Sequence, residues 1–192
     1  MNHLLIKTVV RSLFAVTSRN RAMNKTKRIL EDYMKLADGL SPEAGRRSVK
    51  VPPMRGVDED MRRWSFYMIL EHDTKVNRSI SATIQHLVRG EPLSGAAAVD
   101  PKKDLLPSQS AGEEKLREFR DSVNEHLRMV STLGRLRGTK TAPHPIIGNC
   151  DAHKWACMFS FHLGLHYKQA EHVVQIVKAE QASAPDAKSL DV

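Results

Sequence analysis

The sequence predicts an all-α protein built as a four-helix bundle, and three observations favour this fold class. Apolar residues recur at helical spacing in four long stretches of the 192-residue chain. Loops rich in proline and glycine separate the stretches, and no segment shows the alternating pattern of a strand. Four amphipathic helices of this length bury their apolar stripes by packing side by side.

The first predicted helix spans residues 4–38 and ends at Gly39, a residue type that commonly follows a helix. Its apolar pattern lapses at 17–20, so a break there is an alternative. We expect one apolar face of its first half to pack on the bundle while Lys7 and Arg11 stay in solvent. That face consists of Leu5, Val9, Leu13 and Val16.

The second predicted helix spans 58–89, because Asp58 and Asp60 suit a helix N-terminus and Gly90 follows its end. Residues 64–70 are apolar on nearly every face, which places them deep in the core. The connection that follows, over 90–110, is long enough to cross a bundle of about 30 Å. The second and third helices can therefore run parallel.

The third predicted helix opens with Ser110 and Glu113, which have the spacing of a capping box, and ends near Gly138. A proline-containing loop over 139–149 leads to the fourth predicted helix, over 151–181. The four helices together make a single domain over residues 1–181. Residues 182–192 are expected to form a flexible tail.

Composition narrows the functional classes. No run of 18 apolar residues exists, so we expect no membrane partner. Two cysteines, Cys150 and Cys157, cannot build a disulfide framework, which favours the reducing cytoplasm.

The net charge of +8 is concentrated at one end of the chain. Residues 1–30 carry seven basic residues and no acidic one, whereas the rest of the chain is nearly balanced. No nucleic-acid-binding motif accompanies this charge, so we expect a solvated helix of the domain that binds no nucleic acid. A transit peptide and a nucleic-acid-binding arm are the alternatives.

The sharpest chemical feature is the pair His162 and His166. Four residues apart on a helix, they lie on one face and can reach one metal ion. Burying two imidazoles in an apolar stripe is unfavourable unless each nitrogen finds a partner, and a metal is such a partner. Leu163 stands where zinc proteases with an H-E-x-x-H motif have their catalytic glutamate. The apolar stripe that contains the pair consists of Trp155, Phe159, Val173 and Val177.

His72 is the best candidate for a third ligand, since it shares a stripe of the second helix with apolar residues. Glu71 and Asp73 flank it but are expected to point to other faces, so no general base is evident. Tyr67 and Ser65 are candidates for orienting the ligands. The remaining histidines rank lower as ligands: His3, His86, His126, His144, His153 and His172.

These residues resemble the DinB-like superfamily of metalloenzymes. The similarity lies in the stretch 63–72, the loop 144–148, and a histidine followed 90 residues later by H-x₃-H-x₂-Q, which ends at Gln169. The loop departs from the family pattern at Ile147, where phenylalanine is usual.

The resemblance implies an up-down-down-up four-helix bundle, frequent homodimers, and a divalent metal, often nickel or zinc, held by His72, His162 and His166. Some members of the superfamily transfer low-molecular-weight thiols such as bacillithiol, mycothiol or glutathione. Others isomerise maleylpyruvate.

Three neutral imidazoles suit zinc, nickel or iron and leave a position open for water or substrate. Together with the resemblance, which implies the type of reaction, this leads us to expect a metal-dependent hydrolase or thiol transferase that acts on a small molecule. The alternative is a non-enzymatic bundle that binds a metal or another ligand. The substrate, the reaction and the identity of the metal are not evident from the sequence.

Overall fold

The computed structural model describes residues 3–101 and 103–183, and this part of the chain is mostly helical, which confirms the all-α fold class. The only strands among the described residues form a short hairpin. The α-helices are α1 His3–Val16, α2 Arg19–Ala37, α3 Pro42–Arg46, α4 Phe66–Arg89, α5 Glu114–Thr132 and α6 Ala152–Ser183. The predicted tail lies, from residue 184 onward, outside the described residues.

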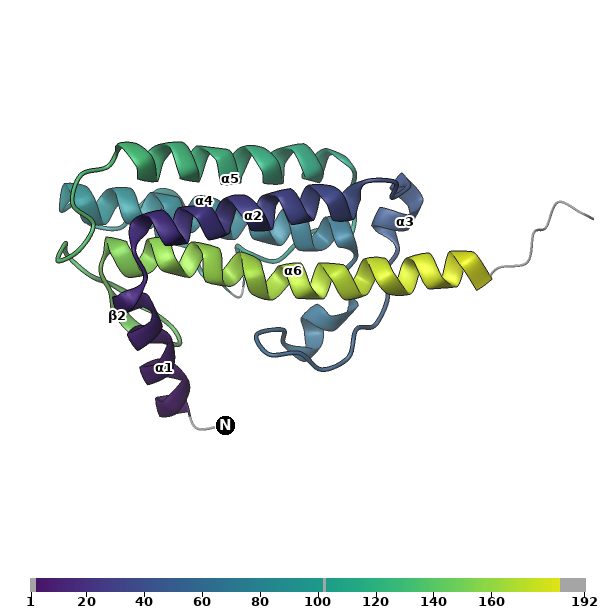
Figure 1. Ribbon diagram of the computed structural model, residues 1–192, viewed down its shortest axis with the longest axis horizontal. Helices are drawn as coiled ribbons and strands as arrows, with labels where there is room; N and C mark the ends of the chain where they lie inside the picture. The colour runs from purple at the N-terminus through teal and green to yellow at the C-terminus, as the bar shows by residue number, and fades with distance from the viewer. Residues whose placement is uncertain (1–2, 102, 184–192) are drawn as a thin grey trace, which may run out of the picture.

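The four long helices α2, α4, α5 and α6 lie side by side (Figure 1). α4 packs against both α5 and α6, and α2 packs against α6 and α5. Each of the four helices contributes large side chains that are completely shielded from solvent. These include Tyr33, Ile84, Phe119 and Phe159.

α4 and α5 run in the same direction. Asn77 donates a hydrogen bond to Ser122 (3.0 Å), and one turn further along both helices Ser81 is hydrogen-bonded to His126 (2.9 Å). The partners advance together along the two helices, which only a parallel pair can do.

The long connection between these two helices returns along α4 and includes the short 3-10 helix η2, Gly95–Ala97. The carbonyl of Leu105 accepts a hydrogen bond from His72 (2.8 Å), and that of Leu106 accepts one from Lys75 (2.6 Å). Both acceptors lie beside the first half of α4, so the connection delivers the chain to the end from which α5 starts.

Three predicted helix boundaries were wrong. The second helix begins at Phe66, not near Asp58, because Ser65 caps it by accepting from the amide of Met68 (3.3 Å). The residues before Ser65 form the 3-10 helix η1, Glu59–Arg63.

The predicted capping box at Ser110 does not form, since α5 starts at Glu114. α5 ends at Thr132, well before the predicted end at Gly138. Beyond Thr132, Arg19 donates hydrogen bonds to the carbonyls of Leu133 (2.7 Å) and Gly134. These bonds direct the chain away from the axis of α5.

The predicted loop 139–149 contains an antiparallel hairpin of β1 Ala142–His144 and β2 Gly148–Cys150. Gly148 has φ +72°, a left-handed conformation that favours glycine. Strands of three residues are too short to show an alternating pattern in the sequence.

The first predicted helix is broken, as its lapse in apolar spacing allowed. Ser18 caps α2 by accepting from the amide of Arg21 (3.2 Å), and α1 projects away from the four long helices (Figure 1). The expected packing face was wrong, because Leu5, Val9, Leu13 and Val16 are all exposed, Val16 to 75%. Among the side chains of α1 that the structure describes, Val10 and Phe14 are buried.

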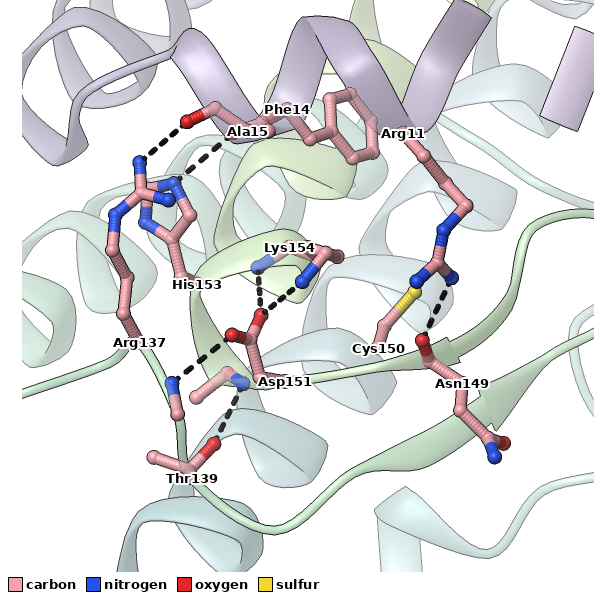
Figure 2. Close-up of polar contacts among 12 residues, drawn as sticks. Arg11, Phe14, Ala15, Arg137, Thr139, Asn149, Cys150, Asp151, His153 and Lys154 are labelled. Carbon is pink, nitrogen blue, oxygen red and sulfur yellow. Dashed lines mark hydrogen bonds and ion pairs between the residues drawn. The ribbon is translucent and has the colours of Figure 1, made fainter. Parts of the chain in front are cut away.

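Polar side chains hold the end of α1 in place (Figure 2). Arg11 is not free in solvent, as it donates to the carbonyls of Ile147 (2.9 Å) and Asn149 (2.9 Å) in the hairpin. The last carbonyls of a helix have no partner within it. Here Arg137 donates to Ala15 O and Thr17 O (3.0 Å each).

His153 also donates to this helix end, with its Nε2 3.2 Å from Phe14 O.

Cys150 and Cys157 are buried free thiols, and burial raises the pKa of Cys157 to about 12.

Within residues 3–101 and 103–183, no helix has both the length and the apolarity needed to cross a bilayer.

Replacing Phe14 with alanine is expected to lower the free energy of unfolding by about 3–5 kcal/mol. Phe14 is fully packed and makes an edge-to-face contact with Phe161 at 5.8 Å. The matched change Leu13→Ala removes an exposed side chain and should stay within about 0.5 kcal/mol of the wild type. Urea denaturation measures both, and a larger loss for Leu13→Ala would contradict this account of α1.

Candidate metal centre

The three histidines singled out in the sequence lie together between α4 and α6. The ring centroids of His72 and His162 are 5.3 Å apart, those of His72 and His166 4.8 Å, and those of His162 and His166 4.6 Å. The spacing of four residues places two of the rings on one face of α6, and the packing of α6 on α4 brings His72 opposite them.

An aromatic side chain packs against the cluster. Trp64, the last residue before the cap of α4, is 4.9 Å from the ring of His72 and is stacked on His166 at 6.3 Å. Trp64 is itself buried. The imidazoles therefore lie in a largely apolar enclosure.

Asp73 joins the cluster, which corrects the prediction that it points to another face. Its Oδ1 is 3.4 Å from His162 Nδ1, and the side chain is completely shielded from solvent. Four side chains each offer one potential ligand atom, and these four atoms lie within 4.8 Å of one another. The four residues are His72, Asp73, His162 and His166.

The flanking glutamate behaves as predicted. Glu71 accepts from the amide of Ser108 (2.8 Å) and pairs with Lys75 (3.1 Å), away from the histidines. The sequence did not single out Asp73, because the stretch of α4 that is buried on every face contains a second carboxylate, Glu71.

Two of the histidines have their Nδ1 atoms held by oxygen acceptors. His72 Nδ1 donates to Leu105 O (2.8 Å), and His166 Nδ1 donates to Gln169 Oε1 (2.9 Å). Gln169 is in turn fixed by donating its amide to Met61 O in η1 (2.8 Å). An oxygen acceptor assigns the proton to Nδ1, so Nε2 carries the lone pair in both rings.

Burial keeps all three imidazoles neutral. It lowers the pKa of His72 and of His162 to about 4 and that of His166 to about 3. Burial also raises the pKa of Asp73. Only a neutral imidazole has a lone pair to give to a metal, so at pH 7 the histidines are in the form that binds one.

The donor set fits a divalent metal. Asp73 Oδ1 and His162 Nδ1 are both buried and have no hydrogen-bond partner within the described ranges. A buried polar atom without a partner is costly, and either a cation at these two atoms or a hydrogen bond between them would remove that cost. The side chain of His162 is 20% exposed, so solvent reaches the cluster at this ring.

Of the histidines ranked lower, His86, His126, His144, His153 and His172 lie outside the cluster. His126 lies between α4 and α5, stacked on Phe159 at 3.5 Å, and His144 of β1 packs beside Trp155 at 5.3 Å. His86 is near Glu91, and His153 holds α1.

The two residues suggested as orienting groups have other roles. Ser65 caps α4, and the ring of Tyr67 lies against Gly45. The polar groups that face the Nδ1 atoms of the histidines are instead Leu105, Gln169 and Asp73.

Comparison of the chain with family models, with curated proteins and with solved structures finds no match. The DinB-like assignment therefore remains a prediction from the residues that carry the resemblance.

The metal-free protein should lose stability as the pH falls from about 6.5 toward 4. The folded-state pKa values of His72 and His162, about 4, lie below the unfolded value of about 6.5, so the unfolded chain binds more protons in this window. Each such histidine contributes a slope of at most about 1.4 kcal/mol per pH unit.

Above about pH 6.5 the contribution is fully present, and it is lost as the pH falls toward the folded-state pKa. Urea denaturation in the presence of a chelator, repeated from pH 7.5 to 4, measures the slope. His162→Gln should have a smaller slope than the wild type, and equal slopes would contradict the prediction.

Proposed function

We propose that this protein is a divalent-metal-dependent enzyme of the DinB-like superfamily, a hydrolase or a low-molecular-weight-thiol transferase. His72, His162 and His166 would hold the metal. The observation that carries the proposal is the convergence of three neutral imidazoles, of which His72 and His166 are buried and have Nδ1 tied to an oxygen and Nε2 free.

The arrangement of the long helices supports the family assignment. α4 and α5 run parallel, and α2 and α6 run opposite to them in Figure 1. This order is consistent with the up-down-down-up four-helix bundle that the resemblance implies.

The donor set favours zinc, nickel or iron, since neutral imidazole suits all three as divalent ions. A metal held by three histidines lowers the pKa of a bound water or binds a thiolate directly. The partly exposed edge of His162 is where a small substrate would approach, while Trp64 shields the opposite side of the cluster.

The buried free thiols fit the expected cytoplasmic setting, which stays a prediction, as does the homodimer.

One observation favours the non-enzymatic alternative. Asp73 lies within ligand distance of the cluster, and a carboxylate in the fourth position would close the site. Closed four-ligand sites are typical of structural metals, whereas catalytic sites keep a position for water.

The untagged protein should contain about one metal ion per chain, as three ligands converge on a single centre. His166→Ala should remove most of that metal. His172→Ala, on the same helix but outside the cluster, should keep it. Elemental analysis after size-exclusion chromatography measures the content, and full retention by both His166→Ala and His72→Ala would refute the site.

The metal-loaded protein should accelerate thiol addition or hydrolysis in a screen of small electrophiles and esters, with bacillithiol, mycothiol and glutathione as thiols. Activity should disappear on chelation and return when the metal is restored. A protein that binds its metal fully, is stabilised by it and shows no metal-dependent turnover would support the structural alternative.

A further inference from the structure

Each of the three histidines has an oxygen atom facing its Nδ1, and the three oxygens are chemically different. For His72 the oxygen is a backbone carbonyl, and for His166 it is the side-chain amide of Gln169. For His162 it is the carboxylate of Asp73, at 3.4 Å. Metal-bound histidines commonly donate their other ring N–H to such acceptors, which fixes the ring and makes the ligand nitrogen more basic.

The Asp73–His162 contact differs from the other two because no hydrogen bond joins the two residues. Asp73 Oδ1 and His162 Nδ1 are both buried, face each other, and are left without a hydrogen-bond partner in the part of the chain that the structure describes. The two atoms are 3.4 Å apart, yet no hydrogen bond joins them. A rotation of the His162 ring that directs Nδ1–H at the oxygen would form one.

The carboxylate cannot turn away easily, because Tyr33 holds its other oxygen. The hydroxyl of Tyr33 donates to Asp73 Oδ2 (2.8 Å). Tyr33 is fully buried, with its ring 4.7 Å from Phe119 and 5.3 Å from Tyr167. A rigid aromatic side chain from α2 thus directs Oδ1 of a residue on α4 toward a histidine on α6.

We propose that Asp73 is a positioning residue for His162, aligned by Tyr33, and not itself a metal ligand. The inference rests on the proposed metal site. In the metal-bound protein His162 Nδ1–H donates to Asp73 Oδ1, and His162 Nε2 faces the metal, as Nε2 of His72 and His166 does. The negative charge of Asp73 partly balances the divalent charge in an otherwise apolar enclosure.

The geometry favours this role over direct ligation. Asp73 Oδ1 is aimed at a ring nitrogen, and if that nitrogen carries the proton the carboxylate accepts from it. All three rings then use Nε2 for the metal and Nδ1 for the hydrogen bond to the supporting oxygen. Direct ligation by Asp73 would require His162 to differ from the other two histidines.

The test uses the full-length protein loaded with Co²⁺, whose visible absorption reports the number and type of metal ligands. Asp73→Ala should lower Co²⁺ affinity by about 10–100-fold and leave the ligand-field bands at their wild-type position and intensity. Asp73→Asn keeps an acceptor oxygen for His162 without the charge, so its loss of affinity should be smaller. Tyr33→Phe should weaken binding in the same direction.

Glu71→Gln is the matched control, since Glu71 also neighbours His72 but contacts Ser108 and Lys75 instead. It should bind Co²⁺ as the wild type does. Circular dichroism of the metal-free variants checks that each is folded. If Asp73→Ala does not fold, Tyr33→Phe still tests the proposal.

Two results would overturn the proposal. A change in band intensity or position in Asp73→Asn would make Asp73 a direct ligand, and wild-type affinity in both Asp73→Asn and Tyr33→Phe would remove its role altogether. Failure of the metal site itself is distinguishable, because the wild-type protein would then bind no Co²⁺ and His166→Ala would change nothing.

Discussion

The burial of polar rings in an apolar interior is the constraint on which the site depends. An imidazole without partners inside a protein costs free energy, so the surrounding structure must supply an acceptor for each ring. The connection between α4 and α5 supplies Leu105 O for His72, and η1 holds the glutamine that supports His166. Segments outside the four long helices therefore complete the centre of the core.

The same constraint links three of the long helices. Tyr33 of α2 bonds to Asp73 of α4, which faces His162 of α6, so one chain of polar contacts crosses the protein. Two atoms in this chain, Asp73 Oδ1 and His162 Nδ1, lack a hydrogen-bond partner among the described residues. These two atoms mark the place where the buried network is incomplete. Full satisfaction of a buried network is what makes it rigid and specific.

The N-terminal helix shows where pattern reasoning fails. Its apolar residues offer two possible packing faces, and periodicity cannot choose between them. Phe14 packs inward because Arg11 reaches the hairpin carbonyls and Arg137 reaches the end of α1, contacts between residues more than a hundred positions apart. Such polar anchors leave no periodic trace, and they place Leu5, Val9, Leu13 and Val16 in solvent.

The sequence by itself determined the helical class, the deeply buried stretch at 64–70, and the inward histidines His162 and His166, because helical spacing places residues on faces. It also pointed to Gln169 through the H-x₃-H-x₂-Q spacing. Only the tertiary structure decided that Asp73 belongs to the cluster and that Leu105 supports His72. Those contacts depend on how α2, α6 and the connection after α4 pack around one helix, and packing between distant segments is not encoded in the spacing of residues along any one of them.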